Sequence, residues 1–361
     1  MGGKDCLQIS ADDKLFMARA LQLARCGEGS TSPNPMVGAV IVCNGRVIGE
    51  GYHIRAGEPH AEVNAVNSVK QCDLPLLECS TMYVTLEPCS HYGKTPPCCD
   101  LIIARKIPRV VIATTDSNDL VNGGGIQRMR AAGIDVSVGV LEEESRRLNG
   151  AFFTFHQKKR PRVTLKWAQT SDGFIDVVRS GGPALAVSDS VSRVAVHKLR
   201  SLHDAILVGT RTAMLDNPSL DVRYWTGRPP LRLVIDREGI LPGGLRLFDA
   251  SSPTVIFTAK AREGLCGKNI EQIVLDFSQD VLPRIMEYLH SRKINSLLVE
   301  GGAVMLQSFI DAGLWDSARV ETNPLLAVGR GVCAPRLANA VKVEEKYCGG
   351  NVVTVFEKSE K

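Results

Sequence analysis

Four residues of this chain have the types and the spacing of a catalytic zinc site. His60 and Glu62 stand two positions apart, and Cys89 and Cys98 follow, each directly after a proline. A histidine and two cysteine thiolates give Zn²⁺ three protein ligands and leave its fourth tetrahedral position open for water. The ion lowers the pKa of that water, and Glu62 can accept the proton and pass it to a leaving amino nitrogen. The residues therefore predict hydrolytic deamination of an amino-substituted heterocycle.

The spacing of the two cysteines differs from the general pattern of zinc deaminases. That pattern is H-x-E followed by P-C-x-x-C, with two residues between the cysteines. Eight residues separate Cys89 from Cys98. A structural zinc with four protein ligands stays an alternative, and Cys99 and His91 are the nearby residues that could supply the fourth ligand. Each of these residues alone is more often a packing or surface residue.

The elements around this motif alternate between helix and strand. Ser10 and Asp13 form a capping box before a helix whose expected apolar face is Leu15, Ala18, Leu21 and Ala24. Asn44 and Gly45 are typical of a hairpin turn. A hairpin followed by alternating helices and strands implies an α/β domain in three layers. The expected strands are 37–42, 46–51, 82–86, 110–113 and 136–140, and the later helices are 61–69, 98–104 and 125–132.

Four segments resemble the deaminase half of the bifunctional riboflavin-biosynthesis deaminase/reductase family. They are residues 32–38, 51–53, 59–63 and 86–98, and the long insertion between the cysteines is the family's distinguishing mark. The resemblance implies a cytidine-deaminase-like fold. It also implies a small-molecule substrate, a diaminopyrimidinone ribosylamine 5-phosphate, whose 2-amino group is replaced by oxygen.

The same resemblance assigns substrate contacts to six residues. Asn34 and His53 are expected to line the pocket for base and ribose. Lys94 suits the phosphate as a point charge. Residues 117–125 depart from the family's pattern, which affects the loop that follows the strand 110–113. The full expected set is Asn34, His53, His91, Lys94, Asp116 and Asn118.

The second half has a strand, glycine, helix arrangement that suits a ligand. An expected strand at 294–300 runs into Gly301 and Gly302, and a helix at 303–312 follows. The start of a helix after glycines can bind phosphate or amide groups. No G-x-G-x-x-G follows the first strand of this half, so a Rossmann dinucleotide site is not indicated.

Five segments of this half resemble the reductase half of the same family: residues 166–173, 197–200, 204–212, 216–220 and 299–302. The resemblance implies a dihydrofolate-reductase-like α/β fold and NADPH as cofactor. Many members have a serine and a tryptophan where this chain has Ala184 and Ala186. The implied NADPH contacts are Ala168, Ala186, Thr212, Asp216, Arg237 and Gly302, and the implied substrate contacts are Lys166, Ala184, Arg200, Leu220, Arg223 and Glu300.

Length and composition set the domain count and exclude several classes of protein. The 361 residues suffice for two domains, which we place at 1–157 for the deaminase and 158–361 for the reductase. An aromatic cluster at Phe152, Phe153 and Phe155 marks the region of the boundary, and the basic run 157–161 suggests a solvated linker there. The net charge of +4 is too small to indicate a nucleic-acid partner.

The remaining expectations concern location, assembly and rival functions. No apolar run approaches the roughly 18 residues of a membrane span, so no membrane partner is expected. An odd count of 11 cysteines without a secretion signal favours free thiols in the cytoplasm. The family suggests a homo-oligomer. Two rivals stay open: a deaminase with a vestigial reductase half, and a nucleic-acid-binding or editing protein with a deaminase fold.

Overall fold

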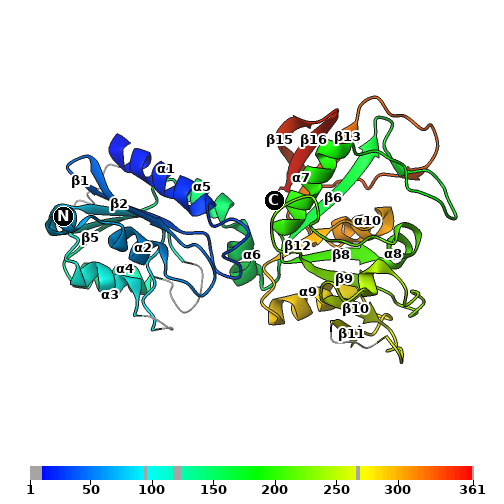
Figure 1. The fold of residues 1–361 in the computed structure, drawn as a ribbon, viewed down its shortest axis with the longest axis horizontal. Coiled ribbons are helices and arrows are strands. Elements are labelled where there is room, and N and C mark those ends of the chain that lie inside the picture. Colours follow the sequence, from blue (N-terminus) through cyan, green and yellow to red (C-terminus); the bar gives the residue numbers. More distant parts are fainter. Residues whose placement is uncertain (1–9, 93–95, 117–122, 266–268, 360–361) are drawn as a thin grey trace, which may run out of the picture. The chain divides into compact units, whose positions relative to one another are not determined.

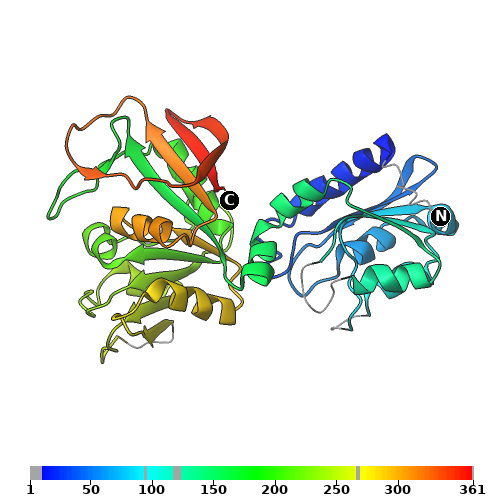
Figure 2. The same ribbon diagram turned by 180° about the vertical axis from the view of Figure 1, so that it is seen from behind.

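The chain divides into two compact units, Met1–Lys158 and Lys159–Lys361. The computed structural model describes residues 10–92, 96–116, 123–265 and 269–359 (Figures 1 and 2). The division falls one residue after the boundary expected from the sequence. Helix α6, Gly150–Lys158, ends the first unit and buries Phe152 and Phe153. The aromatic cluster near the boundary is therefore part of a packed helix.

The first unit is built on one five-stranded sheet with the order β2-β1-β3-β4-β5. Strand β1 pairs antiparallel with β2 and β3, while β3, β4 and β5 run parallel to one another. The elements are α1 (Ala11–Arg25), β1 (Gly38–Cys43), β2 (Arg46–Tyr52), α2 (Ala61–Asn67), η1 (Gln71–Cys79), β3 (Thr81–Leu86), α3 (Cys98–Ala104), β4 (Arg109–Thr114), α4 (Gly124–Ala131), β5 (Asp135–Val138) and α5 (Glu142–Leu148).

Helices cover both faces of this sheet, as Figure 1 shows, which confirms the expected three layers. Helices α2, α3 and α4 contribute Ala65, Ile102 and Met129 to the core on one face. Helix α1 contributes Met17 and Ala20 to the core on the other face. Successive strand residues alternate between these cores, because neighbouring side chains of a strand point to opposite faces.

Local signals in the sequence explain how helix α1 begins and how the chain turns between β1 and β2. The capping box is present, since the amide of Asp13 donates to Ser10 Oγ and the amide of Ser10 donates to the Asp13 carboxylate. Asn44 and Gly45 both have positive φ, as a two-residue hairpin turn requires. The expected apolar face of α1 was wrong at Leu15, which is 63% exposed, because the buried stripe runs through Met17, Ala20, Leu21 and Ala24.

The second unit contains a nine-stranded sheet with the order β11-β10-β9-β8-β12-β6-β13-β16-β15. Its strands from β11 to β13 are parallel, and β16 and β15 add an antiparallel edge. The elements are β6 (Arg162–Thr170), β7 (Phe174–Asp176), α7 (Ser190–Ser201), β8 (Ala205–Gly209), α8 (Thr210–Asp216), β9 (Leu231–Ile235), η2 (Arg246–Phe248), β10 (Thr254–Thr258), β11 (Ile270–Val274), α9 (Val281–Ser291), β12 (Ser296–Val299), α10 (Ala303–Asp311), β13 (Ser317–Asn323), β14 (Val332–Cys333), β15 (Ala340–Cys348) and β16 (Asn351–Lys358).

Helices α9 and α10 pack on one face of this sheet through residues such as Leu289 and Phe309. Arg160, expected in a solvated basic linker, instead bonds to Asp316 at 2.6 and 2.8 Å and is largely buried. This pair fixes the start of the second unit beside β13. Among the helices of the described residues, none has the length and apolar character needed to span a membrane.

Candidate functional site

The structure brings His60, Cys89 and Cys98 together as a candidate metal centre. His60 is the N-cap of α2, Cys89 follows β3, and Cys98 is the first residue of α3. The His60 Nδ1 atom lies 3.4 Å from Cys98 Sγ and 3.6 Å from Cys89 Sγ. The three ligand atoms all lie within 4.8 Å of one another.

These distances fit a tetrahedral zinc ion. Zn–S and Zn–N bonds of about 2.3 and 2.0 Å at tetrahedral angles separate the nitrogen from each sulfur by about 3.5 Å. A negative charge is also stabilised on the Cys89 sulfur. The Cys98 amide donates to Cys89 Sγ at 3.3 Å. The hydrogen bond with the Cys98 thiol is the largest cause that lowers the pKa of Cys89 to about 4, and the hydrogen bond with His60 lowers it further. The donor set therefore fits Zn²⁺ with one open position.

Glu62 lies in the first turn of α2, two residues after His60, and is 3% exposed. Burial raises the pKa of its carboxyl group to about 7, and the charge of His60 opposes this effect. The helix is held close to the sheet because Gly51 of β2 has no side chain. A Cβ there would lie 2.3 Å from the Ala65 backbone nitrogen. A carboxyl group with a pKa near neutrality can accept and return a proton at physiological pH.

Two of the expected substrate residues lie beside the metal centre. Asn34 Nδ2 lies 3.2 Å from His53 Nε2, and His53 Nδ1 lies 3.1 Å from the carbonyl oxygen of Pro59. The rings of His53 and His60 meet edge to face with centroids 5.5 Å apart. Burial lowers the pKa of His53, so its ring is neutral at neutral pH. Asn34 and His53 thus form a polar wall next to the metal ligands.

The other expected residues of this site divide into two groups. Asp116 is buried after β4, and its amide donates to Glu87, which lies two residues before Cys89. His91 is exposed. Lys94 and Asn118 lie outside the described residues. Cys99 turns its thiol to Asp100 at 3.7 Å and is absent from the ligand cluster found among the described residues, so the alternative of a closed four-ligand site is not supported.

The sequence reasoning missed Glu87. Its carboxylate is 3% exposed and accepts hydrogen bonds from four backbone amides, on both sides of residues 117–122. Oε1 accepts from Gly125 and Ile126 at 3.0 and 3.2 Å, and Oε2 accepts from Gly123 and Asp116 at 3.1 and 3.3 Å. The sequence did contain a signal for this role, because a carboxylate directly after a buried strand needs hydrogen-bond donors around it.

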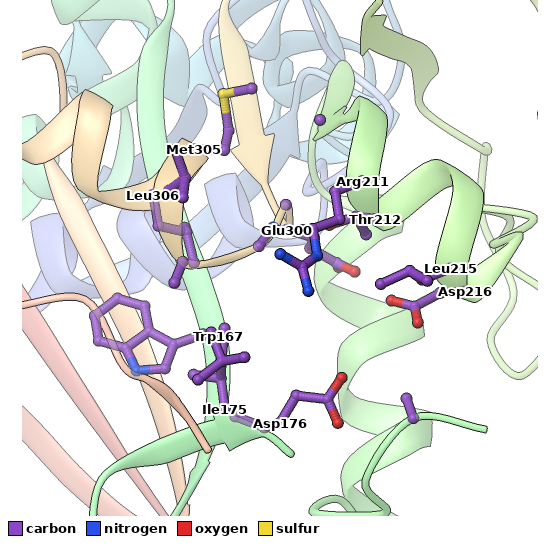
Figure 3. A pocket seen from close by; sticks show the side chains of 18 of the residues that line it. Trp167, Ile175, Asp176, Arg211, Thr212, Leu215, Asp216, Glu300, Met305 and Leu306 are labelled. Atoms are coloured by element: carbon purple, nitrogen blue, oxygen red, sulfur yellow. Dashed lines mark hydrogen bonds between the residues drawn. The ribbon is translucent and has the colours of Figure 1, made fainter. Parts of the chain in front are cut away.

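A second candidate site lies in the C-terminal unit, in a cavity of about 830 Å³ (Figure 3). This volume is in the range of small-molecule and cofactor pockets. Strand β6, the end of β8, helix α8, the residues that follow β12, the start of α10 and the segment after β7 form its walls. The Gly302 amide donates to Thr212 Oγ1 at 2.9 Å, which joins α10 to α8. Eight residues expected from the sequence line it: Lys166, Ala168, Ala184, Ala186, Thr212, Asp216, Glu300 and Gly302.

Four other expected residues do not line this cavity. Arg200 nevertheless reaches its wall, because its guanidinium binds Glu300 at 2.7 and 3.0 Å. Arg223 binds Asp221 at 2.5 Å, and Arg200 also donates to the Asp221 carbonyl oxygen, so the two arginines meet at one residue. Leu220 is 2% exposed and packs in the core. Arg237 pairs with Glu238 at the surface.

The cavity fits a dinucleotide by its polar groups as well as by its size. Lys166, Arg193 and Arg211 line it, and no ion pair of these three residues is found within the described ranges. The start of α10 adds the backbone amide of Ala303. Positive side chains and the start of a helix favour bound phosphate groups. Arg179 and Asp176, which the sequence reasoning also missed, line the same cavity.

Both halves match models of known families. Residues 10–114 match the cytidine and deoxycytidylate deaminase zinc-binding region, and residues 161–346 match the RibD C-terminal domain. The second match covers most of the C-terminal unit, so a vestigial second half is not favoured.

Whole-length relatives agree with this division. The riboflavin biosynthesis protein RibD of Aquifex aeolicus is 41% identical over 325 residues, which are 89% of each chain. That of Escherichia coli is 35% identical over 89% of this chain and 90% of its own. A diaminohydroxyphosphoribosylaminopyrimidine deaminase/5-amino-6-(5-phosphoribosylamino)uracil reductase from Thermotoga maritima matches the structure with a TM-score of 0.87 and 37% identity, over 96% of this chain and 99% of its own. This chain therefore belongs to the RibD family of bifunctional riboflavin biosynthesis enzymes, in which a deaminase and a reductase domain share one polypeptide.

Proposed function

We propose that the N-terminal domain removes the 2-amino group of a 2,5-diamino-6-ribosylamino-pyrimidinone 5′-phosphate. The observation that carries this proposal is the group of His60, Cys89 and Cys98 within 4.8 Å of one another, with the buried carboxyl group of Glu62 two residues from the first ligand. The proposal is also supported by the match of nearly the whole chain to a relative that joins a deaminase to a reductase.

Each residue of this site has a role that follows from its position. His60, Cys89 and Cys98 would hold Zn²⁺, which when bound acidifies water and supplies the nucleophile. Glu62 accepts the proton of that water and returns it to the amino nitrogen that leaves as ammonia. Asn34 and His53, whose side chains lie 3.2 Å apart beside His60, would line the pocket for the base and ribose of the substrate.

The C-terminal domain is proposed to reduce the ribosyl side chain of the deaminated product to ribityl with NADPH. The cofactor supplies the hydride when it is bound. Lys166 lines the cavity and lies close enough to Glu300 for their charges to interact, so its ammonium group can orient the sugar carbon that is reduced. Arg200 and Arg223, which meet at Asp221, suit the sugar phosphate, because a guanidinium binds phosphate oxygens as a fork.

The variant Glu62→Gln tests the deaminase proposal. It keeps the size of the side chain and all three metal ligands but removes the group that carries the proton. We expect deamination, measured as ammonia release from the diaminopyrimidine substrate, to fall by at least about 10²-fold. Bound zinc, measured by elemental analysis, should stay near one ion per chain.

The second domain supplies an internal control for the same protein sample. NADPH oxidation with the deaminated substrate should be unchanged in Glu62→Gln, because the variant leaves the C-terminal cavity untouched. Deamination at the normal rate would refute the role of Glu62. A failure of the unmodified protein to oxidise NADPH would refute the proposed reduction.

A further inference from the structure

The guanidinium group of Arg179 joins separate segments of the cavity wall in the C-terminal unit. Its Nε donates to Asp176 at 2.6 Å, at the end of β7. One terminal nitrogen donates to the carbonyl oxygen of Gly182 at 3.0 Å, and the other donates to Asp216 at the end of α8. The side chain is 8% exposed. A guanidinium can satisfy several acceptors at once, because its five N–H groups have a fixed planar arrangement.

Asp176 in turn holds the segment that follows it. Its Oδ1 accepts the amide of Val177 at 2.9 Å and the amide of Leu185 at 3.1 Å. Leu185 lies between Ala184 and Ala186, and all three residues line the cavity. One carboxylate therefore fixes both ends of residues 177–185, and Arg179 fixes that carboxylate.

The other end of the bridge is helix α8. Arg179 pairs with Asp216, the last residue of α8, and comes within 3.5 Å of the Leu215 carbonyl oxygen. A cation at the end of a helix is favourable because the last carbonyl groups carry partial negative charge. Figure 3 shows Asp176 and Asp216 with their carboxyl groups on the same cavity, one from β7 and the other from α8.

We propose that Arg179 is a positioning residue of the reductase site, which ties residues 177–187 to α8 and so shapes the wall against which the dinucleotide binds. The inference rests on the proposed use of NADPH. Arg179 acts through Asp176 and Asp216, and each of its three guanidinium nitrogens donates to a protein acceptor.

A simpler role for Arg179 is charge compensation. Without its charge the cavity would carry two carboxylates without a cationic partner, which would repel the phosphates of a dinucleotide. The variant Arg179→Lys separates the two roles, because lysine keeps the charge but cannot bridge both carboxylates as a fork. Arg179→Met removes both the charge and the bridge. Arg284→Met is the matched control, since Arg284 forms an exposed ion pair with Glu287 on α9 and does not line the cavity.

The first readout is hydrogen exchange of the full-length, ligand-free protein by mass spectrometry. The Val177 and Leu185 amides are bound to Asp176, so we expect peptides covering 177–187 to exchange at least about tenfold faster in both Arg179 variants. Peptides of α9 and β12 should not change. Unchanged exchange at 177–187 in Arg179→Met would overturn the bridge, whatever the protein does with NADPH.

The second readout is NADPH affinity, followed by quenching of the fluorescence of Trp167, which lines the cavity. We expect both Arg179 variants to bind NADPH about tenfold more weakly, the effect of losing roughly one charge-assisted hydrogen bond. Normal affinity in Arg179→Lys with weak binding in Arg179→Met would overturn positioning in favour of charge compensation. If the unmodified protein does not bind NADPH, the proposed function fails, and the exchange experiment still decides the bridge.

Discussion

Replacing Asp13 by asparagine should destabilise the N-terminal unit by an amount that follows from the hydrogen bonds of the Asp13 carboxylate. Asp13 is 3% exposed in the first turn of α1. Its carboxylate accepts hydrogen bonds from both terminal nitrogens of Arg109 at 2.9 and 3.1 Å, from the Tyr83 hydroxyl at 3.0 Å and from the Ser10 amide at 3.1 Å. These bonds connect α1 to β3 and β4 across one face of the sheet.

The pKa of Asp13 gives the size of the effect. Burial alone would raise this pKa, but Arg109, Ser10 and Tyr83 outweigh burial and lower it from 3.8 to about 2. A difference of roughly 1.8 units corresponds to about 2.4 kcal/mol of folding free energy. Because the folded-state pKa is the lower one, this stability is present above pH 4 and is lost as the pH falls toward 2. About half of it should remain at pH 3.

The assay is urea unfolding of the full-length protein at several pH values, followed by far-ultraviolet circular dichroism. All three tryptophans, Trp167, Trp225 and Trp315, belong to the C-terminal unit, so their fluorescence reports that unit separately. Asp12→Asn is the matched control, because Asp12 is exposed in the same helical turn. Any loss of metal at low pH affects both variants alike. Equal stability of the Asp12 and Asp13 variants at pH 7 would refute the reasoning.

Three further predictions concern the two sites. Removing the metal with a chelator should abolish ammonia release and leave NADPH oxidation intact, and loss of both activities would contradict separate sites. Glu87→Gln places an amide NH₂ against two backbone N–H donors, so we expect a loss of at least about 2 kcal/mol in urea unfolding, with exposed Glu143→Gln as control. Arg200→Met leaves buried Glu300 without its cation and should lower the free energy of unfolding by about 3–5 kcal/mol. The same variant should raise the KM for the reductase substrate, and an unchanged KM would show that Arg200 does not bind this substrate.

Much of the deaminase site could be predicted because its residues are tied to local signals. His60 and Cys98 stand at the starts of helices, and Cys89 lies three residues after the end of β3, so a correct list of elements already brings the three close together. The hairpin at Asn44 and the capping box at Ser10 were predictable for the same reason, since a few neighbouring residues determine each one.

The residues that the sequence did not reveal act through distant partners. The bridging role of Arg179 is evident only in the folded chain, where Asp216, 37 positions later, accepts its hydrogen bond. Glu87 depends on backbone amides 29 to 39 positions away, and no side-chain pattern marks those amides. Leu220 was expected to contact the substrate, but its neighbours in the folded chain enclose it in the core.

The connection between Cys89 and Cys98 is closed at its base. The Cys98 amide donates to Cys89 Sγ, and the Cys99 amide donates to the Cys89 carbonyl oxygen at 3.2 Å. These two hydrogen bonds hold the ends of the insertion, residues 90–97, in place. The length of the insertion therefore has little effect on the positions of Cys89 and Cys98. Extra residues in such a loop cost little closure entropy. Insertions and deletions here can thus accumulate during evolution while the metal ligands keep their places.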